Sequence, residues 1–569
     1  MTDKLQMERE FDFIAPVAPA ERNAAVAEHN RTAVLDEAHL GDITGAFGTI
    51  ARDAHPPTSR WKRLLALLAI MGPGLIVMIG DNDAGGVATY TQAGQNYGTS
   101  LLWTLLLLVP VLIVNQEMVV RLGAVTGVGH ARLIFERFGK FWGAFSVVDL
   151  FILNFLTIVT EFIGISLGFG YFGVSPSLSV PIAAALLILM TVTGSFRRWE
   201  RFMLLFVLVS FATIALGFLV HPVGKEVLHG LFVPGAQGGL DSTALLLIIA
   251  IVGTTVAPWQ LFFQQSNVVD KRITPRWIAF ERTDTVLGSV LTNVGAAALM
   301  IVCAYGFRNT DLFGKFSDTG VVAAGLRDHV SVSAGNILAV VLINASIIGA
   351  AAVTLATSYA FGDVFGVKHS LHRGVKDAKL FYAIFSGLVI VAAAIVLIPN
   401  APLQLMTLAV QALAGLLLPS ATVFLLLLCN DHEVLGPWAN KPWLNAAAAV
   451  IVGTLINLSI MLVVATLFPA VDANFVTGIL FALLAVALVV IGIVSAVRRG
   501  PALATSATVG MTGVDRANWR MPPLAELSKP VWSTTRKVGM LTLRIYLVVA
   551  TALLVFKIVQ LAIGVGAGG

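Results

Sequence analysis

One stretch of the chain constrains its fold more than any other, an apolar segment with carboxylates and glycines at its centre. Residues 72–98 read GPGLIVMIGDNDAGGVATYTQAGQNYG and place Asp81 and Asp83 just before Gly85 and Gly86. The flanking apolar runs are long enough to cross a bilayer, where a charged side chain costs from about 3 to more than 10 kcal/mol. Each glycine weakens a helix by about 1 kcal/mol relative to alanine. We therefore interpret the stretch as a broken helix with a binding site at its gap, because unwound backbone at membrane depth has to line a cavity or pack in protein.

The chain as a whole has the composition of a polytopic membrane protein, with 57% hydrophobic and 12% charged residues. Its apolar segments are mostly about 20 residues long, which suits helices rather than the ~10-residue strands of a membrane barrel. The two cysteines, Cys303 and Cys429, predict neither a disulfide framework nor a metal-thiolate cluster. Basic residues gather at the ends of spans, which argues against a nucleic-acid surface. We expect no enzyme, since we find no phosphate loop, His-rich metal cluster or nucleophile elbow.

Apolar length and charge divide the chain into five parts. Residues 1–61 form a polar tail, 62–430 a transporter core, 431–499 two further spans and 500–536 a polar linker. Residues 537–569 hold an apolar segment, which we interpret as a thirteenth span, with an interfacial helix as the alternative because it contains two cations. The other expected spans are 62–96, 100–120, 142–172, 176–194, 202–220, 242–269, 285–307, 336–365, 380–398, 403–429, 443–468 and 475–497.

Lys and Arg concentrate in every second loop of this layout. The positive-inside rule therefore predicts that the amino terminus, the linker and the end of span 12 are cytoplasmic. We expect an integral protein of a bacterial inner (plasma) membrane, with lipid and an inorganic ion as partners and without nucleic acid.

A second interruption lies midway along span 6. Residues 253–260 read GTTVAPWQ, and Pro258 removes a backbone donor inside an apolar run. Spans 1 and 6 occupy matching positions if spans 1–5 and 6–10 are two halves. Paired broken helices at corresponding places indicate an inverted-repeat secondary transporter with its site near the midplane.

At these residues the chain resembles the NRAMP family of divalent-metal transporters. Residues 72–103 are similar to the family's first helix, whose signature is an Asp-Pro-Gly-Asn break. The runs RLGAVTGVG at 121–129 and GTTVAPWQL at 253–261, and Gln411 with Pro419, follow the family's pattern in order. The resemblance covers about spans 1 to 10. It implies an all-α polytopic membrane protein with a LeuT-type inverted 5+5 helix repeat, discontinuous helices 1 and 6, and additional C-terminal spans.

Departures from the family pattern fall on the ligands of the ion. Asp83 and Gln411 match the family's metal-binding Asp and Gln, but the family's Asn becomes Gly86 and its Met becomes Ala257. Thioether sulfur favours softer metals, whereas carboxylate, carbonyl and water suit Mg²⁺, Ca²⁺ and Mn²⁺. Smaller side chains also enlarge the site, and Mg²⁺ usually keeps several waters. We expect the ion, with Asp83 and Gln411 as its metal ligands, to lie among Gly80, Asp81, Asp83, Gly86, Thr254, Ala257 and Gln411.

The family's proton route is also altered. Its two histidines become Trp259 and Gln264, and an Asp of span 3 becomes Ile158, although Glu161 matches the remaining acid. Losing groups that titrate weakens the case for proton coupling. We therefore predict a secondary transporter of a partly hydrated hard dication, Mg²⁺ or Mn²⁺, that works by alternating access with weak or no proton coupling and needs no cofactor. Glu161 is a candidate gate or proton acceptor, and a hydrogen-bonded structural acid is the alternative.

In a competing interpretation the substrate is an anion instead of a cation. The N–H groups of Gly85 and Gly86 begin a half-helix, and such positive dipole ends hold anions in other transporters. Bicarbonate or another small anion would bind there together with Na⁺, held by Asp83 and by a candidate sodium site on span 8. That site consists of Thr354, Thr357 and Ser358. A second alternative is a non-transporting accessory membrane protein.

Two polar residues outside the breaks have plain structural interpretations. Asp284 lies beside Arg282 near the start of span 7, which predicts an interfacial ion pair. His130 falls in a loop that we place in the cytoplasm, and we expect it to be solvated.

Overall fold

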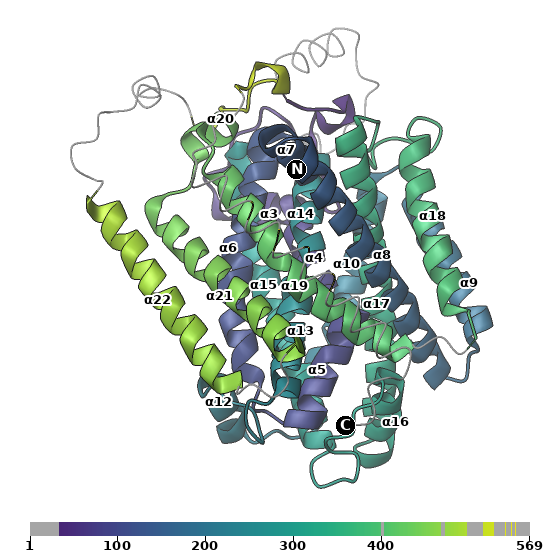
Figure 1. Ribbon diagram of the computed structural model, residues 1–569. Helices are drawn as coiled ribbons and strands as arrows, with labels where there is room; N and C mark the ends of the chain where they lie inside the picture. Colours follow the sequence, from purple (N-terminus) through teal and green to yellow (C-terminus); the bar gives the residue numbers. More distant parts are fainter. Residues whose placement is uncertain are drawn as a thin grey trace.

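The computed structural model describes residues 33–399, 403–467, 473–497 and 516–528, together with four single residues between 541 and 552. Over these ranges the chain is a bundle of long helices (Figure 1). Most of the segment from 537 to 569, which we expected to be a thirteenth span, lies outside the described residues.

The first half of the bundle runs from α3 to α11. Its helices are α3 (Arg60–Ile70), α4 (Pro73–Gly80), α5 (Ala84–Tyr97), α6 (Leu102–Thr126), α7 (His130–Phe138), α8 (Lys140–Tyr171), α9 (Pro176–Thr191), α10 (Phe196–Ser210) and α11 (Ala212–Phe218). The second half comprises α12 (Gly224–Phe232), α13 (Ser242–Thr255), α14 (Pro258–Asp270), η2 (Pro275–Trp277), α15 (Ile278–Gly306), α16 (Thr319–His329), α17 (Val332–Phe365), α18 (Lys379–Val396) and α19 (Leu403–Cys429). The chain continues with α20 (His432–Leu435), η3 (Gly436–Trp438), α21 (Pro442–Leu467), α22 (Ala473–Val497) and η4 (Leu524–Glu526).

The lengths of these helices make this an integral membrane protein. Nine helices in the described ranges are long and apolar enough to cross a bilayer, and α3 with α4, bent by 51°, adds a tenth. The fold is the inverted 5+5 arrangement that the sequence predicts, with both interruptions where it expects them. The bend between α3 and α4 is a feature that the sequence analysis missed, and it occurs at Gly72, whose φ of 153° suits a glycine.

Two faces of the bundle are named here for later use. The α7 face carries α7, α20 and the adjoining helix ends, and the α12 face carries α12 and α16; they are the top and the bottom of Figure 1. Between them, every residue of α14 is buried. The discontinuous helices therefore form the centre of the molecule, with α8 packed against α17 and α15 packed against α4 and α5.

A small β-hairpin precedes the first membrane helix, in the part of the chain that we expected to be a polar tail. It follows η1 (Glu37–His39) and pairs β1 (Ile43–Gly45) antiparallel with β2 (Gly48–Ile50). Arg201 Nε of α10 donates to Ala46 O at 2.9 Å, and Arg272 Nε donates to Ala38 O at 2.9 Å. The hairpin is therefore held on the α7 face by side chains from two helix ends.

Asp36 anchors the stretch that contains η1 and the β1–β2 hairpin, which we call the hairpin segment. Its carboxylate accepts hydrogen bonds from Arg373 Nε at 2.9 Å and from the backbone N–H of His369 at 3.0 Å. Burial alone would raise the pKa of Asp36, but the hydrogen bonds from Arg373 and from the Ala38 N–H outweigh it and hold the pKa below its ordinary value. The stabilisation that Asp36 provides is therefore complete above the ordinary Asp pKa of about 4 and decreases only as the pH falls below it.

We expect Asp36→Ala to expose the hairpin segment to protease. A hydrogen bond to a charged group contributes about 1.5–3 kcal/mol, so trypsin cleavage after Arg52 at pH 7 should rise about tenfold or more. Appearance of the fragment that ends at Arg52, followed by mass spectrometry, is the measurement. Glu37→Ala removes a neighbouring, exposed acid and serves as the control. Equal cleavage of the two variants would contradict the role assigned to Asp36.

Candidate functional site

Asp83 lies in the gap of the first discontinuous helix. α4 ends at Gly80 and α5 begins at Ala84, which leaves three residues between the two helices, the first two of them in a tighter i→i−3 turn. Asp83 is the N-cap of α5, and its Oδ1 accepts the Gly86 N–H at 2.7 Å. The carboxylate is almost completely buried. An acid at a helix N-terminus is stabilised by the helix dipole, which allows a charge to persist at this depth.

The second gap meets the first one. α13 ends at Thr255 and α14 begins at Pro258, with Ala257 as its buried N-cap residue. A Cβ on Gly86 would lie 3.2 Å from Thr254 Oγ1, so the two gaps are in direct contact. The Thr254 hydroxyl is buried and has no hydrogen-bond partner among the described residues. An unpaired buried oxygen at a junction of broken helices is available to a ligand.

Asp81 faces the same junction. Its Oδ1 accepts a hydrogen bond from Gln260 Nε2, and its buried Oδ2 has no partner in the described part of the chain. Gln260 in turn accepts from Gln116 Nε2 at 3.2 Å. The sequence analysis did not assign a role to either glutamine, although a polar residue directly after the Pro258 interruption was the available signal.

Gln411 of α19 completes the cluster. A Cβ on Gly85 would lie only 1.6 Å from Gln411 Nε2, so only glycine allows the amide to approach α5 this closely. Gly80, at the end of α4, packs instead against Ile348 and Trp259. The structure thus brings together Asp81, Asp83, Gly86, Thr254 and Gln411 around the two gaps, with Gly80 and Ala257 at the helix ends beside them.

Glu161 of α8 reaches the same place from the opposite side. Its Oε2 accepts the Ala84 N–H at 3.1 Å, directly next to Asp83 in the chain. Glu161 Oε1 is buried without a partner among the described residues. The acid therefore satisfies a backbone N–H at the start of the half-helix, beside Asp83.

The hydroxyls proposed as a sodium site are largely engaged within the protein. Thr357 Oγ1 accepts from Asn154 Nδ2 at 2.8 Å, and Ser358 Oγ donates to Thr354 O at 2.9 Å. Only Thr354 Oγ1 is buried without a partner in the described ranges. Two of the three groups thus serve as contacts within and between helices.

The interpretation of Asp284 as an ion pair with Arg282 was wrong. Asp284 Oδ2 accepts three backbone N–H groups at the start of α4, at 2.8–3.2 Å, while Arg282 pairs with Glu117. The four free N–H groups of a helix N-terminus need acceptors, and Asp284 supplies one from α15. This tertiary contact has no local signal in the sequence.

His130 was also expected to be solvated and is instead fully buried. Its Nδ1 lies 2.9 Å from Gln265 Oε1 of α14, and its ring packs edge-on against Phe262. The loop that we predicted is the short helix α7, which begins at His130 and packs on α8 and α14.

Access to the candidate site is asymmetric. A cavity of about 120 Å³ is lined by Ala84, Ala88 and Thr160 next to the site and by Phe316 and Asp318 near the α12 face. On the α7 face, by contrast, the end of α4 distant from the site is sealed by buried polar contacts and by the hairpin segment. The cavity therefore leads toward Asp83 from the α12 face.

No group of three or more His, Cys, Asp or Glu in the described ranges is arranged to hold a metal ion. An ion at Asp83 would thus be held by few charged ligands together with amide, hydroxyl, backbone and water oxygens. Such a donor set suits hard cations.

Two interrupted helices that meet at buried carboxylates, inside an inverted helix repeat, define a LeuT-type membrane transporter fold. The family model described as "Natural resistance-associated macrophage protein-like" matches residues 74–465, and the chain belongs to this family. It is 27% identical over 427 residues to the divalent metal cation transporter MntH of Lacticaseibacillus casei, covering 72% of this chain and 91% of the relative. MntH of Bacillus subtilis is 27% identical over 413 residues, covering 70% and 93%. The crystal structure of the Eremococcus coleocola manganese transporter, in complex with an aromatic bis-isothiourea substituted compound, matches with a TM-score of 0.58 at 21% identity, covering 79% of this chain and 99% of that one.

Proposed function

We propose that the protein is a secondary transporter of a hard divalent cation, Mg²⁺ or Mn²⁺, that works by alternating access. The observation that carries the proposal is the buried Asp83 carboxylate at the junction of both helix gaps, beside the Gln411 amide. The relatives named as divalent metal cation and manganese transporters support a dication. Buried acids within membrane spans mark ion paths, and this one lies next to a cavity.

None of the residues that we place at the junction carries sulfur, which favours a hard ion. Ala257 occupies the N-cap of α14 and offers no thioether. The sulfur of Met78, on α4, accepts a hydrogen bond from Ser289 of α15 at 3.4 Å and is thus engaged with that helix. Oxygen ligands with room for water suit Mg²⁺ and Mn²⁺.

Weak proton coupling is the second part of the proposal. Trp259 and Gln264 do not titrate, and Gln264 Nε2 donates to Thr285 Oγ1 at 2.9 Å. Glu161, which accepts the Ala84 N–H beside Asp83, remains as a candidate gate or proton acceptor.

The anion alternative is less well supported by the same geometry. The N–H groups of Ala84 and Gly86 already donate to Glu161 and Asp83, so carboxylates occupy the positive end of α5. Two of the three hydroxyls in the candidate sodium site are also engaged. These contacts favour a cation over bicarbonate with Na⁺.

We assign the α7 face to the cytoplasmic side of a bacterial inner membrane. Basic side chains concentrate there, as Arg121, Arg197, Arg272, Arg276, Arg282, Arg373, Lys379 and Lys441 show. The positive-inside rule then directs the cavity beside Ala84 to the exterior.

Uptake into liposomes containing the purified protein tests the function. We expect flux of Mg²⁺ or Mn²⁺ that exceeds that of empty liposomes and changes little when a pH gradient is imposed. Na⁺-dependent entry of labelled bicarbonate without divalent flux would contradict the proposal. A ligand-dependent shift of the melting temperature separates a transporter from an accessory protein, because only a bound ligand stabilises by mass action.

Ala257→Met should shift the ion preference toward softer metals. A thioether at the α14 N-cap would add one soft ligand, so Cd²⁺ uptake relative to Mg²⁺ should rise about tenfold, equivalent to about 1.4 kcal/mol. Ala257→Leu has a similar volume without sulfur and is the matched control. An equal change in both variants would show that volume, rather than ligand chemistry, sets the preference.

A further inference from the structure

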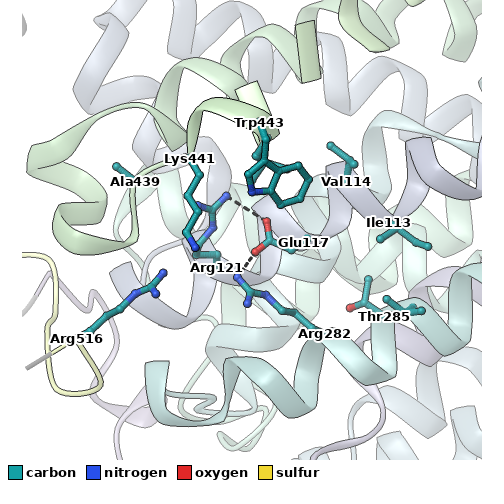
Figure 2. Close-up of a pocket in the computed structure, with 12 residues that line it drawn as sticks. Ile113, Val114, Glu117, Arg121, Arg282, Thr285, Ala439, Lys441, Trp443 and Arg516 are labelled. Carbon is teal, nitrogen blue, oxygen red and sulfur yellow. Dashed lines mark hydrogen bonds and ion pairs between the residues drawn. The ribbon is translucent and has the colours of Figure 1, made fainter. Parts of the chain in front are cut away.

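A second cavity lies away from the ion site, near the α7 face. It has a volume of about 330 Å³ and is formed by α6, α15, the start of α21 and the segment between η3 and α21 (Figure 2). Arg121, Arg282 and Trp443 lie near the ends of their helices on this face. The ion path described above does not use any of these side chains.

Positive charge dominates the polar part of this cavity. Arg121, Arg282, Lys441 and Arg516 line it, and Glu117 is the only acid among the described lining residues. Figure 2 shows Glu117 between Arg121 and Arg282, with an ion pair to each. One carboxylate therefore serves two guanidinium groups, which leaves an excess of cationic side chains at the cavity.

Two of the guanidinium groups each have one nitrogen without a hydrogen-bond partner. Arg121 is only 3% exposed; its terminal nitrogens donate to Trp438 O, Glu117 and Asn440, and only its Nε has no partner in the described part of the chain. The Nε of Arg282 is likewise buried and unpaired there. Arg516 lies over the Trp438 ring at 3.9 Å, and its pKa is lowered by burial and by the neighbouring guanidinium groups of Arg282 and Arg121. An acceptor with several anionic oxygens would satisfy these donors and relieve the repulsion.

The remaining lining is apolar except for Thr285, and part of it is exposed at the surface. The apolar residues are Ile113, Val114, Val286, Ala439, Trp443 and Leu444, of which Val286 and Trp443 are exposed. Trp443 is 65% exposed at the start of α21, the position at which aromatic side chains meet the lipid headgroup region. A ligand that fills this cavity therefore needs an anionic head and apolar chains.

We propose that this cavity binds the phosphate headgroup of an anionic phospholipid from the cytoplasmic leaflet, with its acyl chains along α21 and α15. Basic pockets between membrane helices on the cytoplasmic side are suited to such headgroups. Free phosphate shares the head chemistry but would leave the apolar lining unused, and for this reason we choose the lipid. The cavity lies between α21 and the core of the bundle. Thr285, which lines the cavity, also contacts Gly74 of α4 and Gln264 of α14.

Lipid binding to the purified full-length protein in neutral detergent tests this site. Phosphatidylglycerol, phosphatidylcholine and inorganic phosphate are titrated separately, and binding is read by native mass spectrometry and melting temperature. We expect phosphatidylglycerol to bind at least fivefold more tightly than phosphatidylcholine. Each basic residue near an anionic lipid contributes about 1 kcal/mol, so Arg282→Gln with Lys441→Gln and Arg516→Gln should weaken phosphatidylglycerol about a hundredfold. Arg198→Gln, an exposed residue at the start of α10 on the same face, should change little.

Each outcome decides for or against the proposal. Equal binding of the two lipids by the unmodified protein would overturn it without any variant. Phosphate binding as strong as that of phosphatidylglycerol would show a site for free anions instead of lipid. A loss in Arg198→Gln equal to that of the triple variant would show a general charge effect. If the triple variant does not fold, Lys441→Gln alone, at an exposed position, replaces it, with an expected loss of about fivefold.

Discussion

Asp83→Ala is expected to reduce ion uptake in liposomes to the level of empty vesicles. The change removes the carboxylate at the junction of both helix gaps, and with it the charge that balances a dication in a buried site. A dication bound within the membrane depends strongly on such a charge. We therefore expect ion uptake to fall at least a hundredfold, equivalent to about 3 kcal/mol. Uptake of Mg²⁺ and Mn²⁺ is the measurement.

The Asp83→Ala change removes both a helix cap and an ion-binding carboxylate, and the two effects have to be separated. Asp241 provides a matched control, because its Oδ1 caps α13 by accepting the Ala244 N–H at 2.7 Å, much as Asp83 caps α5. Each alanine variant should lose about 1 kcal/mol of stability through its cap. Only Asp83→Ala should stop transport. Unchanged uptake in Asp83→Ala would remove the ion site from this junction.

Lys271→Met is expected to destabilise the protein by about 3–5 kcal/mol. Lys271 Nζ is buried, lies 2.6 Å from Glu200 Oε1 and donates to Met71 O at 3.0 Å, just before the bend at Gly72. Removing one partner of a buried pair leaves an uncompensated charge, which is the costly change.

The free energy of unfolding in detergent, from denaturant titration, measures this effect. Lys62→Met changes an exposed lysine of α3 and should stay within about 0.5 kcal/mol of the unmodified protein. Adding Glu200→Gln to Lys271→Met removes both charges and should recover part of the loss. A Lys271→Met protein as stable as Lys62→Met would show that the pair does not hold the α7 face together.

Local chemistry in the sequence predicted the positions of the helix interruptions. An Asp caps a helix start better than it continues a helix, and a proline is tolerated in the first turn but interrupts a helix interior; α5 begins directly after Asp83, and α14 begins at Pro258. Apolar length likewise predicted the helical membrane architecture, which the helices and the family match confirm.

Other contacts depend on residues that are far apart in the chain. The hairpin at 43–50 folds on the ends of α10 and α14, and no periodicity in a polar tail indicates that surface. Gln260 had a weak signal beside the proline, but its pairing with Asp81 spans 179 positions.

The sequence by itself determined that this chain crosses a membrane through helices and that two of them are interrupted, because hydropathy and helix propensity act over short distances. Tertiary structure alone decided which acids meet a cavity and which satisfy backbone groups. Asp83 and Asp284 are both buried acids, yet one lies at the junction of the two gaps and the other accepts three N–H groups at the start of α4. Their difference arises because a buried carboxylate takes its role from the donors that packing brings to it.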